Sequence, residues 1–187
     1  ERNNFLTLVS YPTISGYYQQ RAIFEYLKDL KATNKKKYWL CISQYAVLIT
    51  WIAAAFLIDW QKALFFVIIP QQVSLFSVLI FNYVQHVHAN EESEWNHSRN
   101  FTGFLNFMLF NNGYHTIHHH KAGLHWSQVP EVHSEIEHNI NPILLERSFW
   151  WYIFRSYILS IFIPKFRTNS MRLERMRKEE IIRNNEK

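Results

Sequence analysis

Two long runs without a charged residue limit the folds open to this chain more than any other feature of its sequence. The first run, Trp39 to Ile58, has 20 residues and a single glutamine. As a helix it would be about 30 Å long, which matches the hydrocarbon core of a bilayer. The second run, Ala63 to Val84, is interrupted by Pro70 and two glutamines. Buried helices of a soluble bundle are the alternative, but the length of both runs and their lack of charge favour membrane spans.

The residues that flank the two runs predict how they cross the membrane. Only the four residues from Asp59 to Lys62 separate the runs, so we expect an antiparallel transmembrane hairpin. Five lysines lie between Lys28 and Lys37. Because lysine is enriched in cytoplasmic loops, both outer ends of the hairpin are expected on the cytoplasmic side. Upstream, Ala22 to Leu30 has helical apolar spacing and is expected either along the membrane surface or packed on a core.

Composition narrows the class of protein further. The net charge of +5 comes from basic residues beside the apolar runs. This placement fits membrane topology better than a nucleic-acid groove, so no nucleic-acid partner is expected. Mean hydropathy is only −0.21 because charged segments outside the runs offset them. Cys41 is the single cysteine, which excludes a disulfide within the chain and a thiolate metal site.

The apolar stretches beyond the second run are too short or too polar to cross the bilayer again. Phe101 to Phe110 is apolar but has only ten residues, and Phe149 to Ile163 carries Arg155 at its middle. Tryptophan and tyrosine side chains near the start of the latter favour an interfacial helix. The charged segment from Met171 to the C-terminus is expected as a solvated cytosolic helix or as disordered chain.

The histidines are segregated, because all ten lie between His86 and His138. Within the sequence HTIHHH, the residues His115, His118 and His119 are spaced i, i+3 and i+4, which places three imidazoles on one face of a helix. Three neutral imidazoles on one face can chelate iron, copper, zinc or nickel. A histidine-rich surface patch without a metal is the alternative, but the aromatic and apolar surroundings of the cluster favour a metal site.

A second polar pair, Asn82 and His86, lies at the expected cytoplasmic end of the second apolar run. The two residues are four apart and therefore point the same way from a helix. Taken alone, the pair is more typical of an interfacial anchor than of a metal site. Competing catalytic motifs are missing from the sequence, since it has no HExxH, GxSxG, GxxxxGK or GxGxxG.

Together these motifs resemble those of the membrane fatty acid desaturase and hydroxylase superfamily. The HxxHH sequence from His115 to His119 resembles its third histidine box, and Asn82-xxx-His86 resembles its additional ligand pair. The run Trp126 to Pro130 resembles the stretch that follows the box in many bacterial members. Asn-Tyr-x-Gln-His, ending at His86, also resembles the Asn-Tyr-x-Glu-His motif of membrane alkane hydroxylases, and His97 to Asn100 resembles their sequence between motifs.

The resemblance implies a set of metal ligands and a cofactor. The implied iron ligands are His86, His115, His118 and His119, with Asn82 holding a metal-bound water. The implied cofactor is a non-haem di-iron centre with O2 as co-substrate. Residues without a counterpart in the family motifs are candidate partners of these ligands: His88, His97, His120, His125, Glu131 and Glu135.

The implied reaction is the introduction of a double bond into a fatty acyl chain, held as an acyl lipid or acyl thioester. A separate ferredoxin or cytochrome-type protein would supply electrons. A hydroxylase or ketolase acting on alkanes, carotenoids or sterols is one alternative, and an inactive membrane relative is another. The family has two earlier boxes, HxxxH and HxxHH, whereas residues 1–85 contain no histidine. We therefore expect the chain, which begins at Glu1, to be N-terminally truncated and inactive alone.

These interpretations combine into one predicted organisation. The chain is expected to be a single all-α integral membrane domain in the bacterial inner membrane or the endoplasmic reticulum, with its metal site on the cytoplasmic side. The predicted segments are cytosolic or interfacial residues 1–38, the transmembrane hairpin 39–84, the metal-binding cytosolic region 85–145, and an interfacial helix with a charged tail over 146–187.

Overall fold

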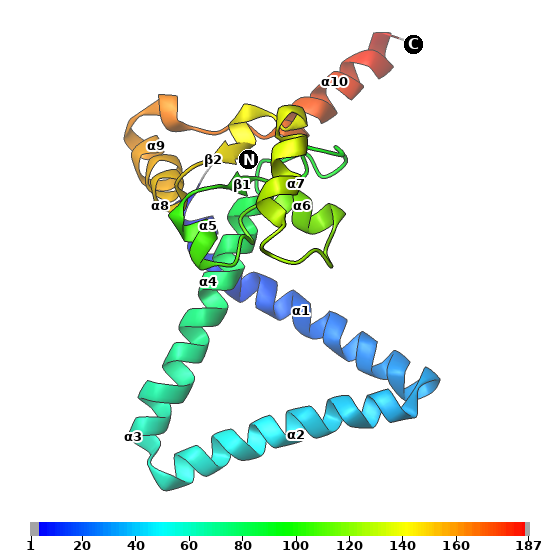
Figure 1. The fold of residues 1–187 in the computed structure, drawn as a ribbon, viewed down its shortest axis with the longest axis vertical. Coiled ribbons are helices and arrows are strands. Elements are labelled where there is room, and N and C mark those ends of the chain that lie inside the picture. Colours follow the sequence, from blue (N-terminus) through cyan, green and yellow to red (C-terminus); the bar gives the residue numbers. More distant parts are fainter. Residues whose placement is uncertain (1–3, 186–187) are drawn as a thin grey trace. The chain divides into compact units, whose positions relative to one another are not determined.

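The computed structural model describes residues 4–185, which are mostly helical (Figure 1). The chain forms two compact units. The first consists of Val9–Ile80, and the described part of the second covers residues 4–8 and 81–185. The single-domain organisation stays a prediction.

Long helices make up the first unit. Most of α1 (Phe5–Thr33) and all of α2 (Lys35–Ile58) belong to it. Asn34 separates these helices, and its side chain accepts a hydrogen bond of 3.0 Å from the backbone N–H of Lys37, so that it caps the start of α2. The helix predicted from Ala22 to Leu30 thus lies within the C-terminal half of the much longer α1.

The first apolar run forms α2, and none of its residues is buried within the structure. Trp39, Val47 and Leu57 are all more than half exposed. A helix that leaves so many apolar side chains without a protein partner is unsuited to water. By length and composition, α2 and the helix Trp60–His86 both qualify as membrane spans.

The second apolar run is one helix in three parts: α3 (Trp60–Ala63), the π-helical segment η1 (Leu64–Ile68) and α4 (Ile69–His86). The predicted four-residue break is shorter than expected, because Asp59 alone is extended and its side chain caps α3 by accepting from the N–H of Lys62. The π segment comes just before Pro70. Proline lacks an N–H and crowds the carbonyl four residues earlier, which a wider turn relieves. Antiparallel packing of the two spans stays a prediction.

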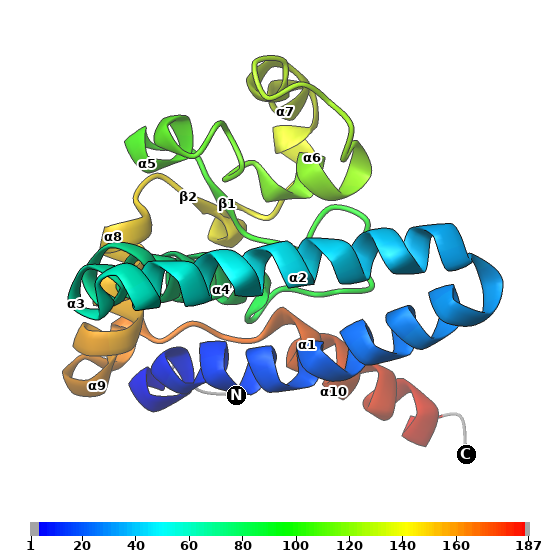
Figure 2. The same ribbon diagram turned by 90° about the horizontal axis from the view of Figure 1, so that it is seen from below.

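Short elements make up the second unit. Its helices include α5 (Phe104–Met108), α6 (His115–His120) and α7 (Val129–Ile136), of which α6 and α7 contact each other (Figures 1 and 2). Strands β1 (Asn100–Phe101) and β2 (Leu145–Glu146) pair in parallel, with Asn100 opposite Leu145. The 3-10 segments are η2 (Glu137–Asn139), η3 (Pro142–Leu144) and η5 (Pro164–Phe166). The two-residue strand pair departs from the predicted all-α fold.

One further helix, predicted from Phe149 to Ile163, consists of α8 (Phe149–Ile153), the π-helical η4 (Phe154–Leu159) and α9 (Ser160–Phe162). One of its faces is buried, and Arg155 on it forms an ion pair with Glu146. The opposite face exposes Trp150 and Phe162. An exposed apolar face is what an interfacial helix needs, although that placement stays a prediction. The C-terminal α10 (Met171–Asn185) has no buried residue, as a solvated helix requires.

An aromatic cluster forms the core where α4, β1 and α8 meet. Phe81, Phe101, Phe149 and Tyr152 are all buried, and their neighbouring ring centroids lie 5.2–5.7 Å apart. Such contacts add to the free energy gained by burying apolar surface. The cluster thereby fixes the last turns of α4 against β1 within this unit.

A buried arginine completes this attachment. Arg99 is 1% exposed, and its Nη1 donates hydrogen bonds to the carbonyls of Val84 (2.8 Å) and Val87 (3.1 Å). Its backbone N–H donates to the carbonyl of Gln85, and its guanidinium lies 4.3 Å from the ring centroid of Tyr152. The last carbonyls of a helix have no partner within it and carry partial negative charge. Arg99 therefore caps the end of α4.

A close backbone contact also fixes the start of α6. The N–H of Gly113 donates to Asn106 Oδ1 (2.6 Å), and its carbonyl accepts from the N–H of Phe101 (2.9 Å). A Cβ atom at position 113 would lie 2.3 Å from the carbonyl oxygen of Phe101. No side chain fits there, so the sequence requires glycine at this position.

Replacing Arg99 by methionine removes the guanidinium but keeps an apolar stem. We expect the free energy of unfolding to fall by about 2–4 kcal/mol, because buried carbonyls at the end of α4 lose their donor. Thermal unfolding of the purified protein in detergent, followed by circular dichroism, measures the change. Arg183→Met at an exposed position of α10 is the matched control. Equal losses in both variants would contradict the capping role.

Replacing Gly113 by alanine should cost about 1–3 kcal/mol, because the new methyl group has to displace the backbone of Phe101. Gly123→Ala is the matched control, since a Cβ atom there meets nothing within 4 Å. The same unfolding measurement compares the two variants. An alanine at position 113 that is as stable as one at position 123 would refute the close contact.

Candidate metal centre

Three histidines from two segments converge in the second unit. His86 is the last residue of α4, and His115 and His119 lie one turn apart on α6. Their Nε2 atoms are separated by 3.0 Å (His86 and His115), 3.2 Å (His115 and His119) and 3.4 Å (His86 and His119). The structure thus brings together the end of the second apolar run and the HxxHH sequence, which are almost 30 positions apart.

These separations fit a metal ion bound by all three imidazoles. Imidazole nitrogens bind first-row metals at about 2.0–2.1 Å, so bond angles between octahedral and tetrahedral values place neighbouring nitrogens about 3.0–3.4 Å apart. Hydrogen bonding explains the arrangement less well, because three ring nitrogens that point at one spot cannot all be both donor and acceptor. The three side chains therefore form a donor set that suits a divalent metal.

A buried polar network holds α6 in place. Asn100 donates from Nδ2 to Thr116 Oγ1 (2.9 Å), and its Oδ1 accepts from the backbone N–H of Thr116 (3.0 Å). Ser98 Oγ lies 3.1 Å from the same hydroxyl. All three residues are completely buried, where unpaired polar groups would be costly. The network therefore fixes the first turn of α6, which carries His115.

His86, the third member of the group, is held in place by contacts from the segment between α4 and β1. His86 lies between the two carbonyls that Arg99 caps, so the end of α4 cannot fray without breaking buried hydrogen bonds. The backbone of His97 also lies near the His86 imidazole and partly offsets the lowering of its pKa by burial. Both contacts come from the segment that links α4 to β1.

The surroundings keep these imidazoles neutral. Burial, together with repulsion from His86, His119, His118 and His97, lowers the pKa of His115 to about 3. Burial and repulsion from neighbouring histidines lower the pKa of His119 to about 4. At neutral pH both rings are therefore unprotonated, which is the form that binds a metal.

The predicted ligands His118 and Asn82 lie outside this group. The ring of His118 is exposed and stacks on His115 at a centroid distance of 5.4 Å. Asn82 is exposed on α4, one turn before His86. Helical spacing alone placed all three histidines of HxxHH on one face, but His86 approaches the i and i+4 members and leaves the i+3 member aside. The roles of His118 and Asn82 stay predictions.

Other histidines make local contacts of their own. His120 Nε2 lies 2.9 Å from the carbonyl of Glu94, and its ring stacks on Trp95 at 4.9 Å. His88 is buried, with Nδ1 2.8 Å from Thr168 Oγ1, and His125 Nδ1 contacts Ser127 Oγ at 2.8 Å. These contacts are typical of structural histidines.

No carboxylate joins the three-histidine group among residues 4–185. Glu131 and Glu135, which were candidate partners of the ligands from the sequence, are both exposed on α7. The role proposed for them from sequence therefore has no contact in the structure to support it.

The structure points to two histidines, His97 and His133, that the sequence motifs did not identify as ligands. His97 lies beside His119, with ring centroids 5.1 Å apart. His133 on α7 is 2% exposed, its ring lies 4.4 Å from that of Tyr114, and neither of its ring nitrogens has a hydrogen-bond partner in the described chain. Pro130 in the first turn of α7 signals a helix start, but the burial of His133 depends on the contact of its ring with Tyr114.

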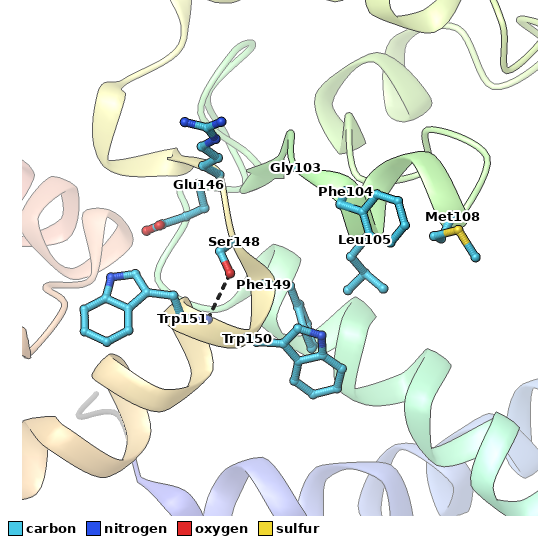
Figure 3. A pocket seen from close by; sticks show the side chains of 10 residues that line it. Gly103, Phe104, Leu105, Met108, Glu146, Ser148, Phe149, Trp150 and Trp151 are labelled. Carbon is cyan, nitrogen blue, oxygen red and sulfur yellow. Dashed lines mark hydrogen bonds between the residues drawn. The ribbon is translucent and has the colours of Figure 1, made fainter.

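A cavity of about 720 Å³ lies between α5 and α8 in the same unit (Figure 3). Its lining is mainly apolar and aromatic, and Figure 3 shows Leu105, Met108 and Trp150 around it. The backbone N–H of Trp151 donates to Ser148 Oγ (3.2 Å) and caps α8 at the rim of the cavity. None of the three converging histidines lines this cavity, so its chemistry is separate from that of the metal group.

Comparison with known protein families matches residues 3–151 to the family described as fatty acid desaturase. Neither the curated proteins nor the solved structures gave a match. The matched range includes both helices that are long and apolar enough to span a membrane, and it contains the three converging histidines. Since it covers most of the sequence, the chain belongs to the fatty acid desaturase family.

Proposed function

We propose that the protein is an O2-dependent di-iron oxidoreductase that introduces a double bond into a fatty acyl chain. The observation that carries this proposal is the convergence of His86, His115 and His119 in a chain of the fatty acid desaturase family. Their Nε2 atoms are spaced for a shared metal, and the pKa values of His115 and His119 are low enough to keep both rings neutral. A purely structural histidine cluster would need neither property.

The proposed iron ligands are His86, His115, His118 and His119, with Asn82 holding a metal-bound water. Three of these side chains already form one donor set. His118 stands outside it and is proposed to ligate the second iron, since one helix then serves both metals. A two-iron site needs further ligands besides these four histidines.

When bound, the di-iron centre supplies O2 activation and the removal of hydrogen from an unactivated C–H bond. The overall change converts –CH2–CH2–, O2, two electrons and two protons into –CH=CH– and two waters. The chain's own residues would hold the metal through neutral imidazoles, and they keep the start of α6 and the end of α4 rigid. Such rigidity matters because the reacting carbon has to be held within reach of the metal.

Two candidate membrane spans and the family indicate membrane association. We propose a multi-pass protein whose metal site faces the cytoplasm, because five lysines precede the first span and His86 ends the second. An acyl lipid or acyl thioester would enter from the apolar side. A separate ferredoxin or cytochrome-type protein would supply electrons from the aqueous side.

Removal of one converging ligand should reduce bound metal. In the protein expressed from its complete reading frame, His115→Ala is expected to lower iron content at least about tenfold. The matched control is His138→Ala, an exposed histidine of the same unit that has no contact with the group. Metal analysis of both purified proteins measures the difference. Full iron occupancy in the His115 variant would exclude the proposed ligand set.

The identity of the product tests the reaction itself. Expression in a host that lacks the activity should add a monounsaturated acyl chain to the membrane lipids, which mass spectrometry of derivatised fatty acids detects. His115→Ala expressed at the same level should add none. An oxygenated product would instead indicate a hydroxylase or ketolase, as the Asn-Tyr-x-Gln-His sequence at Asn82 to His86 also allows. No product from an iron-loaded protein would indicate an inactive relative.

A further inference from the structure

The loop between α4 and β1 holds one histidine in a fixed orientation. His97 Nδ1 lies 2.9 Å from the carbonyl oxygen of Glu94 and 3.2 Å from that of Ser93. A carbonyl oxygen can only accept a hydrogen bond, so Nδ1 must carry the hydrogen. In the neutral ring, Nε2 is then the nitrogen with the free lone pair.

That second nitrogen is buried and has no hydrogen-bond partner among residues 4–185. Buried polar atoms are almost always paired, and an exception calls for an explanation such as a metal ion. A ring that donates one N–H to a backbone carbonyl and presents the other nitrogen unprotonated is the usual arrangement of a metal-bound histidine. His97 already has this arrangement.

His97 borders the three-histidine group through His119, but its ring nitrogens are not within 4.8 Å of all three members, so its side chain would have to move closer to bind the same ion. The His97 ring centroid lies 5.1 Å from that of His119, at an interplanar angle of 75°. Within the three-histidine group the corresponding distances are 4.7–5.1 Å. Two imidazoles that share one metal at about 2.1 Å have their centroids about 5 Å apart.

The loop is also built to keep its carbonyls in place. The N–H of Ser93 donates to the carbonyl of Asn90 (2.9 Å), and the N–H of Asn90 donates to the carbonyl of Asn96 (2.8 Å). Asn96 Oδ1 in turn accepts from the N–H of Asn141 (2.7 Å), which joins the loop to a distant segment. The orientation of the His97 ring is therefore set before any metal binds.

We propose that His97 is a further ligand of the metal centre and binds through Nε2. The inference rests on the proposed function, because it adds one imidazole to the donor set of His86, His115 and His119. Its neighbour His120 differs, since Nε2 of that ring is already engaged with the Glu94 carbonyl. Of these two neighbouring rings, His97 is thus the proposed ligand and His120 supports the loop.

The test separates ligation from support of the loop. In His97→Asn, the side-chain amide takes the place of Nδ1–H and can still donate to the Ser93 and Glu94 carbonyls, but nothing replaces Nε2. With the full-length protein in detergent, Co²⁺ titration followed by visible absorption gives the affinity and reports the ligand environment of the metal. We expect His97→Asn to bind Co²⁺ at least about tenfold more weakly. We also expect a changed d–d spectrum.

The matched control is His120→Ala, which removes a contact with the same Glu94 carbonyl and leaves the proposed ligand intact. It should bind Co²⁺ with the affinity and spectrum of the unmodified protein. If His97→Asn also retains both, the His97 inference fails while the three-histidine centre stands. If the unmodified protein does not bind Co²⁺, or if His115→Ala binds it equally well, the proposed function fails together with the inference.

Discussion

The capping of α4 by Arg99 is the interaction on which the metal group depends. A buried guanidinium is tolerable only when hydrogen bonds replace its hydration, and the carbonyls of Val84 and Val87 supply them. The same carbonyls need a donor, because a helix leaves its last four unpaired. Arg99 Nη1 and the two carbonyls therefore satisfy each other, whereas Arg99 Nε has no partner among residues 4–185. His86 lies between the two capped carbonyls. The position of His86 is therefore set by the contact of Arg99 with the backbone on either side of it.

The segment that contains Arg99 serves both halves of the group. Ser98 and Asn100, on either side of the arginine, bind Thr116 and so position α6. His97, just before them, contacts the ring of His119. Four consecutive residues, His97 to Asn100, thus fix the end of one helix, the start of another and a neighbouring ring. The sequence that resembled a stretch between the motifs of alkane hydroxylases acts here as the frame of the site.

Sequence reasoning predicted the parts of this site that depend on local periodicity. Charge-free length identified both candidate spans, and the spacing of the HxxHH residues indicated a metal site. The spacing of Asn82 and His86 alone favoured an interfacial anchor, and only the family resemblance implied that His86 is a ligand. The exclusion of His118 from the convergent group depends on the direction from which His86 approaches, which no local pattern contains. His97 has a free Nε2 because its Nδ1 bonds to backbone carbonyls of a loop. The directions of those carbonyls cannot be predicted from the amino-acid sequence. The π turn before Pro70 could have been expected from the proline.

The close approach of the three histidine rings is energetically unfavourable without a metal ion and becomes favourable when one is bound. Three ring nitrogens converge within 3.4 Å, and desolvation together with repulsion between the rings disfavours protonation, as the pKa values of about 3 and 4 for His115 and His119 indicate. Repulsion of this kind persists only where surrounding structure over-determines it. Here the buried bonds of Arg99 and of Asn100 with Thr116 supply that constraint. A divalent ion would turn the repulsion into attraction without moving the frame, so the same contacts that stabilise the fold also organise the site in advance for a metal.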